Sequence, residues 1–288
     1  MRGSVAVRTD TTSVRRPREV RYNPPVWRQW NLIWNFAQRD LKSKFKGAAL
    51  GWAWSLVVPL ATLGIYTIVF SVVFRMEPPK FGNGREGVFV VFLFAGLTAW
   101  TFLSSSINAG ISGLIGTGAL LKKIYFPPYA PVIGAAVAVG VQSLIELSIF
   151  LVVLAALGNI GWTWLLVPIW VALFAVFSVA LATVLAILNV YLRDLAHLVS
   201  IALQLLFYAT PIIYPIDRVP ETFRGVPMRA VIEWSPISQF IHVFRDLTYG
   251  LSPGAWISWL VLIASAAGAL ALAVLVNRRR GGDLGEEL

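Results

Sequence analysis

Long apolar runs dominate the chain, and its charged residues gather in the short stretches between them. The runs without Lys, Arg, Asp or Glu cover residues 47–74, 87–121, 124–192 (interrupted only by Glu146), 195–216 and 247–277. A helix that crosses the hydrocarbon core needs about 20 predominantly apolar residues, and several of these runs are longer. The pattern therefore predicts an all-α integral membrane protein.

Six membrane-spanning helices fit these runs. We expect them at about 50–74, 88–113, 131–157, 162–190, 196–214 and 255–276. The turn-like residues 158–161 (Gly-Asn-Ile-Gly) divide the third span from the fourth, which predicts a tight hairpin. Pro211 and Pro215 interrupt the fifth span, and a broken helix is tolerated only beside protein or a water-filled cavity. Residues 215–254 are too polar to span, so short re-entrant helices are expected there.

The N-terminal part divides into a tail and an amphipathic helix. Residues 1–25 lack a helical pattern and are expected to form a disordered cytoplasmic tail, not a signal peptide. In residues 26–48 an aromatic and apolar stripe recurs at helical spacing, at Trp27, Trp30, Trp34, Ala37, Leu41 and Phe45. The basic residues Arg28, Arg39, Lys42 and Lys46 fall on the other side. Such a helix lies in the membrane surface; the alternative is a soluble helix packed on a partner. Residues 49–277 would form the permease domain and 278–288 a cytoplasmic tail.

The positions of Lys and Arg predict the orientation. With six spans, 17 of the 24 Lys and Arg residues lie on the side of the termini and 7 on the opposite side. By the positive-inside rule, both termini are expected in the cytoplasm.

Composition supports membrane insertion and excludes several classes of site. Hydrophobic residues make up 57% and charged residues 13% of the 288 residues, and the mean hydropathy is +0.72. There is no cysteine, which excludes disulfides and thiolate metal sites. The net charge is +10, and the basic residues flank apolar spans, where they set the topology and contact anionic lipids. Nucleic-acid binding is therefore not expected.

No catalytic motif is present in the sequence. The two histidines, His197 and His242, have no second ligand at metal-binding spacing, and no P-loop for ATP is found. Residues 104–106 are serines without the context of a nucleophile. Glu146 is the only intramembrane carboxylate, where proton-coupled carriers usually have several. It has two open interpretations, a functional group or a hydrogen bond between helices. We predict a non-enzyme without a metal or cofactor of its own.

Four sequence blocks resemble the permeases of polysaccharide-exporting ABC transporters, in the order expected for that family. The blocks are Gln38-Arg39-Asp40-Leu41-Lys42-Ser43-Lys44-Phe45-Lys46 with Leu50-Gly51-Trp52-Ala53-Trp54 and Pro59; Leu121-Lys122-Lys123-Ile124-Tyr125-Phe126-Pro127; Asn189-Val190-Tyr191-Leu192-Arg193-Asp194-Leu195 with Ala209-Thr210-Pro211-Ile212-Ile213-Tyr214-Pro215; and Ser235-Pro236-Ile237-Ser238 through Arg245-Asp246. The tail before Pro25 is not covered.

The resemblance implies a half-transporter of the bacterial cytoplasmic membrane. It would form a homodimer and pair with two copies of a separate ATPase subunit that binds ATP and Mg²⁺. Its cargo would be a lipid-linked polysaccharide such as an O-antigen, a teichoic acid or a cell-wall galactan. Independently, a chain without a P-loop or proton relay must obtain its energy from a partner.

Particular residues are candidates for coupling, gating and lipid contact, and the resemblance suggests the first of these roles. The segment from about 116 to 127 would be a coupling helix in a cleft of the ATPase; its residues are Leu121, Lys122, Lys123, Ile124, Tyr125 and Phe126. The alternative is that its two lysines only anchor the span end. Arg193 and Asp194 are predicted to gate or to lock two helices, as is Glu146. Arg39, Lys42 and Lys46 are predicted to contact lipid headgroups or to anchor the surface helix.

Aromatic side chains are candidates for a sugar-conducting channel, because their faces contact sugar rings without fixed hydrogen bonds. The candidates are Trp100, Phe102, Phe207, Tyr208 and Tyr214. Most other aromatic residues are expected at the membrane interfaces. Two other functions remain open: an ABC permease for a drug or lipid, and a self-contained carrier or flippase, which would show internal repeats.

Overall fold

A computed structural model of the chain describes residues 26–45, 53–121, 126–281 and 284. The predicted tail at 1–25, Lys46 and residues 122–125 lie outside the described residues, as do the side chains of Trp27, Arg28 and Phe45. Within the described part, the chain is helical and has no strand apart from one isolated bridge between Phe223 and Val226. The predicted all-α class is confirmed.

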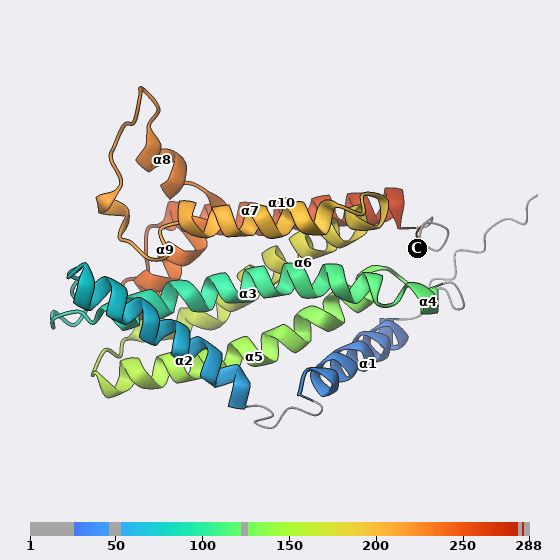
Figure 1. The fold of residues 1–288 in the computed structure, drawn as a ribbon, viewed down its shortest axis with the longest axis horizontal. Coiled ribbons are helices and arrows are strands. Elements are labelled where there is room, and N and C mark those ends of the chain that lie inside the picture. Colours follow the sequence, from blue (N-terminus) through green and yellow to red (C-terminus); the bar gives the residue numbers. More distant parts are fainter. Residues whose placement is uncertain (1–25, 46–52, 122–125, 282–283, 285–288) are drawn as a thin grey trace, which may run out of the picture.

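Among the described residues, four helices are long and apolar enough to cross a membrane. They are α3 (Phe89–Ile115), α5 (Tyr129–Ala156), α6 (Val167–Tyr191) with the preceding short helix η3 (Trp162–Leu166), and α10 (Trp256–Arg280). They match the predicted second, third, fourth and sixth spans within a few residues, and they run along the long axis of the molecule (Figure 1). The turn between α5 and η3 falls at 157–161, as predicted.

Two shorter apolar segments correspond to the predicted first and fifth spans. Helix α2 (Trp54–Thr67) continues without a break into the π-helical turn η2 (Ile68–Val73). Together they reach about 30 Å at 1.5 Å per residue. Helix α7 (Leu195–Ala209) has 15 residues and reaches only about 22 Å. Helix length therefore establishes four spans and leaves the predicted count of six open.

The core is centred on α3, which packs against α5, α6 and the shorter helix α9 (Pro236–Thr248). Aromatic rings fill the junction of α6 with α9. The Trp170 ring stacks on Phe174 at 4.9 Å and on Phe244 at 4.4 Å between centroids. Each of these three side chains is buried. This cluster fixes α9 against the start of α6.

Helix α1 (Val26–Phe45) lies obliquely against the N-terminal half of α5, and its packing face differs from the predicted stripe. Ile33, Phe36 and Ala37 are buried, whereas Trp30 is 60% exposed. The reason is the close approach at Gly134 of α5, where a Cβ would stand 2.5 Å from the Phe36 Cβ. Of the predicted stripe, Trp30 and Trp34 are thus left on the outside of the molecule, where an indole suits a membrane interface.

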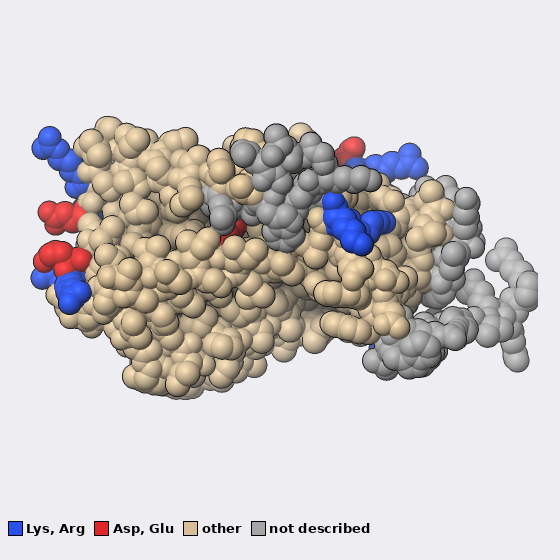
Figure 2. Space-filling view, turned by 90° about the horizontal axis from the view of Figure 1, so that it is seen from below, with Lys and Arg blue, Asp and Glu red and all other residues tan. Residues whose placement is uncertain are grey.

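The remaining short helices mark the two ends of the molecule. Helices η4 (Ile216–Arg218), α8 (Met228–Glu233) and α9 lie at one end, and α4 (Gly118–Leu121) lies at the other end with the last turn of α10 (Figure 1). Figure 2 shows that Lys, Arg, Asp and Glu gather toward these two ends of the face in view, while most of the middle lacks them. This distribution fits a bilayer around the middle of the molecule.

Candidate export path and coupling site

The predicted break of the fifth apolar segment is real, and α7 ends at Ala209. Thr210 is extended, as expected for a residue before a proline. Beyond the break, the Arg245 guanidinium donates hydrogen bonds to the main-chain oxygens of Pro211 (Nη1, 2.6 Å) and Ile212 (Nη2). An arginine of α9 therefore satisfies two main-chain carbonyl groups of the irregular segment that follows α7.

Arg245 is packed closely on its other side as well. Its Nη2 donates to the Phe92 main-chain oxygen of α3 at 3.2 Å, and its Cζ lies 3.7 Å from the Phe92 ring centroid. Gly96, one turn further along α3, makes room, because a Cβ there would be 2.6 Å from Nη2. No carboxylate among the described residues lies within ion-pair distance of Arg245. Main-chain dipoles and an aromatic face balance its charge instead.

Arg245 was predicted only as part of a sequence block and without a role, although a signal for its position exists. Arg245 follows Ile241 by four residues and precedes Thr248 by three, and both of these are buried. Helical spacing therefore places this cation toward the buried face of α9. Its main-chain partners could not be found in this way, because they lie 33 or more residues away in the sequence.

Side chains of α6, of η3 and of the turn before η3 also bind α9. Trp170 Nε1 donates to the Phe240 oxygen at 2.9 Å, and Thr163 Oγ1 donates to the Leu247 oxygen at 2.7 Å. In the turn after α5, Asn159 Nδ2 donates to two main-chain oxygens at the C-terminal end of α9, at 2.9 and 3.0 Å. These bonds join the α5–α6 hairpin to α9 at one end of the molecule.

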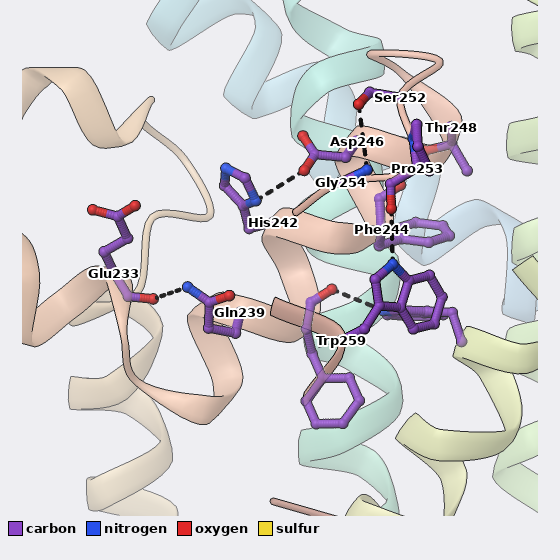
Figure 3. Close-up of polar contacts among 12 residues, drawn as sticks. Glu233, Gln239, His242, Phe244, Asp246, Thr248, Ser252, Pro253, Gly254 and Trp259 are labelled. Atoms are coloured by element: carbon purple, nitrogen blue, oxygen red, sulfur yellow. Dashed lines mark hydrogen bonds and ion pairs between the residues drawn. The ribbon is translucent and has the colours of Figure 1, made fainter. Parts of the chain in front are cut away.

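The exposed side of α9 carries an ion pair. His242 Nδ1 lies 3.1 Å from Asp246 Oδ2, one helical turn away (Figure 3). The hydrogen bond that His242 donates to Asp246 raises the pKa of this histidine above its usual value of 6.5, against the opposing effect of burial. Gln239 Nε2 donates to the main-chain oxygen of Glu233 at 2.8 Å and so joins α9 to α8.

Four of the five predicted channel aromatics lie together near the break. Phe207 has its ring 5.7 Å from that of Trp100 and 5.1 Å from that of Tyr208. The Tyr214 hydroxyl donates to the main-chain oxygen of Tyr208 at 3.1 Å. Tyr208 is 57% exposed, whereas Trp100 is buried. The structure therefore gathers these residues around the end of α7.

The fifth candidate, Phe102, lies elsewhere. Its ring packs against Phe174 at 5.7 Å and borders a cavity between α3, α5 and α6. Phe102 and the group near the end of α7 thus lie in different surroundings.

Arg193 and Asp194 occupy the turn between α6 and α7, and both are exposed. Within the described part of the chain, neither forms an ion pair. The contact that fixes this turn comes from the buried Asn189, whose Oδ1 accepts a hydrogen bond from the Ala196 N–H at 2.6 Å. The proposed locking or gating role of the Arg-Asp pair stays a prediction.

Glu146 is buried in α5 and borders a small cavity whose lining is mainly apolar. Gln142 Nε2, one turn earlier, donates to Glu146 Oε1 at 3.1 Å. The cavity of about 100 Å³ also touches Thr62 of α2 and Thr98 and Thr101 of α3. This site brings hydroxyl groups of two other helices to the one carboxylate among the spans.

The predicted coupling segment begins where α3 ends. Thr117 Oγ1 donates to the Leu114 oxygen at 2.8 Å, and the one-turn helix α4 follows. Leu121 and Phe126 are buried on either side of residues 122–125, which lie outside the described residues. The Phe126 ring lies 5.5 Å from that of Phe36, so this segment contacts α1 directly.

The basic face of α1 is exposed where it is described. Arg39 pairs with its neighbour Asp40 at 3.0 Å and lies over the Phe36 ring at 5.1 Å. Lys42 is exposed. Both are placed to meet a lipid surface, and their role in substrate binding stays a prediction.

Comparison with known proteins decides the family. The profile described as ABC-2 type transporter matches residues 31–249, which include most of α1, the coupling segment, the break and α9. The chain belongs to the ABC-2 type transporter family. The resemblance drawn from the four sequence blocks is confirmed.

Three curated relatives of this ABC-2 type transporter have recorded functions. It is 34% identical to an O-antigen export system permease, RfbA, of Myxococcus xanthus over 193 residues, 66% of this chain and 70% of that protein. It is 28% identical to the RfbA permease of Klebsiella pneumoniae over 221 residues, 76% and 80% of the two chains. It is 19% identical to the polysialic acid transport protein KpsM of Escherichia coli over 248 residues, 83% and 90%.

Proposed function

We propose that this ABC-2 type transporter is the transmembrane subunit of an ABC exporter that moves a lipid-linked cell-surface polysaccharide across the bacterial cytoplasmic membrane. The observation that carries the proposal is the similarity to permeases named for O-antigen export and polysialic acid transport, along two thirds or more of the chain. O-antigen, teichoic acid and galactan are candidate polymers.

The energy source would be a separate ATPase, present in two copies, that binds ATP and Mg²⁺. The coupling contact would be the segment from Leu121 to Phe126, which contains Lys122, Lys123, Ile124 and Tyr125. In support, the segment follows α3 directly, and Phe126 packs on Phe36 of α1. A displacement of this segment by the ATPase would therefore be transmitted to both α3 and α1.

A homodimer would cover the apolar sides of α2 and α7. Ile65 and Ile68 are 63% and 60% exposed, and Leu205 is 66% exposed. The two helices meet through the rings of Tyr66 and Phe207, 6.4 Å apart, so their exposed sides adjoin. Irregular backbone beyond α7 needs cover by protein or water at membrane depth, and a second copy would supply it.

The export path would then pass the end of α7, between the two copies. Phe207, Tyr208 and Tyr214 would offer sugar rings broad aromatic contact there. Helices α8 and α9 would re-enter the outer leaflet and close the path when no polymer is present. With α2 and α7 as additional spans the chain would cross the membrane six times, and both termini would be cytoplasmic.

The test is depletion of the protein in its native bacterium, with separate measurement of surface polysaccharide and of lipid-linked polymer at the inner leaflet. We expect loss of the surface polymer and accumulation of the lipid-linked form. Normal surface polysaccharide after depletion would refute the proposal. In proteoliposomes, uphill transport by this chain without a nucleotide-hydrolysing partner would also refute it.

A further inference from the structure

Two cavities on the side of α5, α6 and α10 join into one groove. The first, about 330 Å³, lies between α3, α5, α6 and α9. The second, about 450 Å³, lies between α5, α6 and α10. Ile133, Ala175 and Val179 line both, so the two are contiguous.

The groove is as long as a lipid chain in one leaflet. Trp170 lines its one end and Thr183 its other end, thirteen residues further along α6. That separation is about 20 Å at 1.5 Å per residue, against about 15 Å for half of a 30 Å hydrocarbon core. Val176, Leu270 and Val274 on its margin are 41%, 49% and 43% exposed, so the groove opens to the surroundings of the protein.

The chemistry of the groove changes along its length. Its middle is lined by apolar side chains of α5 and α6. At the end near the C-terminus of α10, Asn277 and Arg278 line it instead. Arg278 is exposed and begins a run of three arginines in the last turn of α10. The groove therefore has an apolar shaft and a cationic mouth.

We propose that this groove binds an anionic membrane phospholipid, with one acyl chain along α6 and the phosphate at Arg278. The shape and charge match such a lipid, because basic pockets between helix ends bind anionic headgroups. A zwitterionic lipid would fill the same shaft, but it would bring no net charge to the mouth. The site lies on the α5–α6–α10 side, away from the end of α7 where the export path is proposed. It does not depend on the export function.

The test measures lipid retention on the purified full-length protein by native mass spectrometry. The probes are phosphatidylglycerol and phosphatidylcholine with identical acyl chains. We expect phosphatidylglycerol to be retained at least fivefold better. Arg278→Gln should reduce that preference about fivefold, the factor that one surface arginine contributes. Arg279→Gln is the matched control, because Arg279 is also exposed but does not line the groove.

A second pair of variants tests the shaft. Ala175→Leu places a larger side chain where the two cavities meet and should lower retention of both lipids. Ala172→Leu, also on α6 but exposed and outside the lining, should not. Equal retention of the two lipids by the unmodified protein would overturn the proposal. So would an effect of Arg279→Gln as large as that of Arg278→Gln, or no effect of Ala175→Leu.

Discussion

Buried polar residues in this protein stabilise the ends of helices. Asn189 accepts from the first turn of α7, Asn159 donates to the last carbonyls of α9, and Arg245 donates to the carbonyls beyond α7. The two asparagines satisfy main-chain groups that helix ends leave without a partner, and Arg245 satisfies carbonyl groups of the non-helical segment beyond α7. In a bilayer such groups cannot turn to water, so these three side chains are required for the irregular backbone between the apolar helices.

Replacement of Arg245 should therefore loosen the α7 break. We expect Arg245→Met to destabilise the protein by about 3 kcal/mol or more, because it removes three charge-assisted hydrogen bonds and a cation–π contact. Arg245→Lys should recover only part of this, since an ammonium group cannot reach all three carbonyls in the same fork. Thermal unfolding in detergent measures the change.

Arg218→Met is the control for Arg245→Met, since Arg218 is exposed on η4 and has no described hydrogen bond from its side chain. It should unfold at the temperature of the unmodified protein. An Arg245→Met variant that is as stable as this control would contradict the assigned role.

For Glu146, substitutions separate charge from hydrogen bonding. Glu146→Gln keeps an oxygen that can accept from Gln142, so stability and export should be retained. Glu146→Leu leaves the Gln142 amide without that acceptor and should cost about 1–3 kcal/mol. Unfolding temperature and export are the measurements. Lost export in a stably folded Glu146→Gln variant would instead assign a function to the ionisable group.

At the scale of elements, the sequence predicts helices better than it predicts their faces. The bounds of α5 and α6 and the turn at 157–161 follow from apolar length and from Gly-Asn-Ile-Gly. The stripe predicted for α1 concerns the face toward the membrane surface, and it does not show which residues pack on α5. Contact with α5 depends on close approach at Gly134, which favours Ile33, Phe36 and Ala37.

Helix α9 should respond to pH through its ion pair. The pKa of His242 is raised, so the pair stabilises the fold fully below the usual value of 6.5, and the stabilisation is lost as pH rises through the higher folded-state value. The difference in unfolding temperature between the unmodified protein and His242→Gln should therefore shrink as pH increases from 5.5 to about 8. Glu233 also favours the charged imidazole, and Arg245 opposes it.

The control for the pH series is Asp246→Asn, which removes the charged partner of His242. In that background, His242→Gln should have little effect on unfolding at any pH in the series. A difference that grows with pH would contradict the assignment.

The contact between α1 and the coupling segment should transmit the movement of the ATPase to the transmembrane helices. Phe126→Ala removes a buried ring that touches Phe36, which should cost about 3 kcal/mol locally. In the complex with the ATPase, we expect export per ATP hydrolysed to fall severalfold while the ATPase remains bound. Phe223→Ala, at an exposed position, is the control. An unchanged ratio of export to hydrolysis in Phe126→Ala would argue against coupling through this contact.

Across the whole molecule, the loops at the α9 end are joined by many hydrogen bonds, whereas helix α2 is loosely packed. At the end with α9, three loops are joined by hydrogen bonds from side chains to main chain: Asn83 and Arg85 donate to the turn after α5, and Tyr249 donates to Pro79. Helix α2, in contrast, packs mainly on α3 and leaves much of its apolar surface exposed. The most closely packed part is therefore the α3–α5–α6–α9 unit, and α2 is an element whose apolar surface needs a partner.

The six-span topology can be tested on the two segments whose length leaves it open. The chain has no cysteine, so a single introduced cysteine is the only thiol. Ser43→Cys and Lys80→Cys flank α2, and Arg193→Cys and Arg218→Cys flank α7; all four positions are exposed. If α2 and α7 both cross, a membrane-impermeant maleimide added to spheroplasts labels Lys80→Cys and Arg218→Cys at once, and labels the other two only after permeabilisation. Equal labelling of the Arg193→Cys and Arg218→Cys variants would mean that α7 turns back within the membrane, because both of its ends would then lie on one side. The unmodified protein, which cannot react, provides the background.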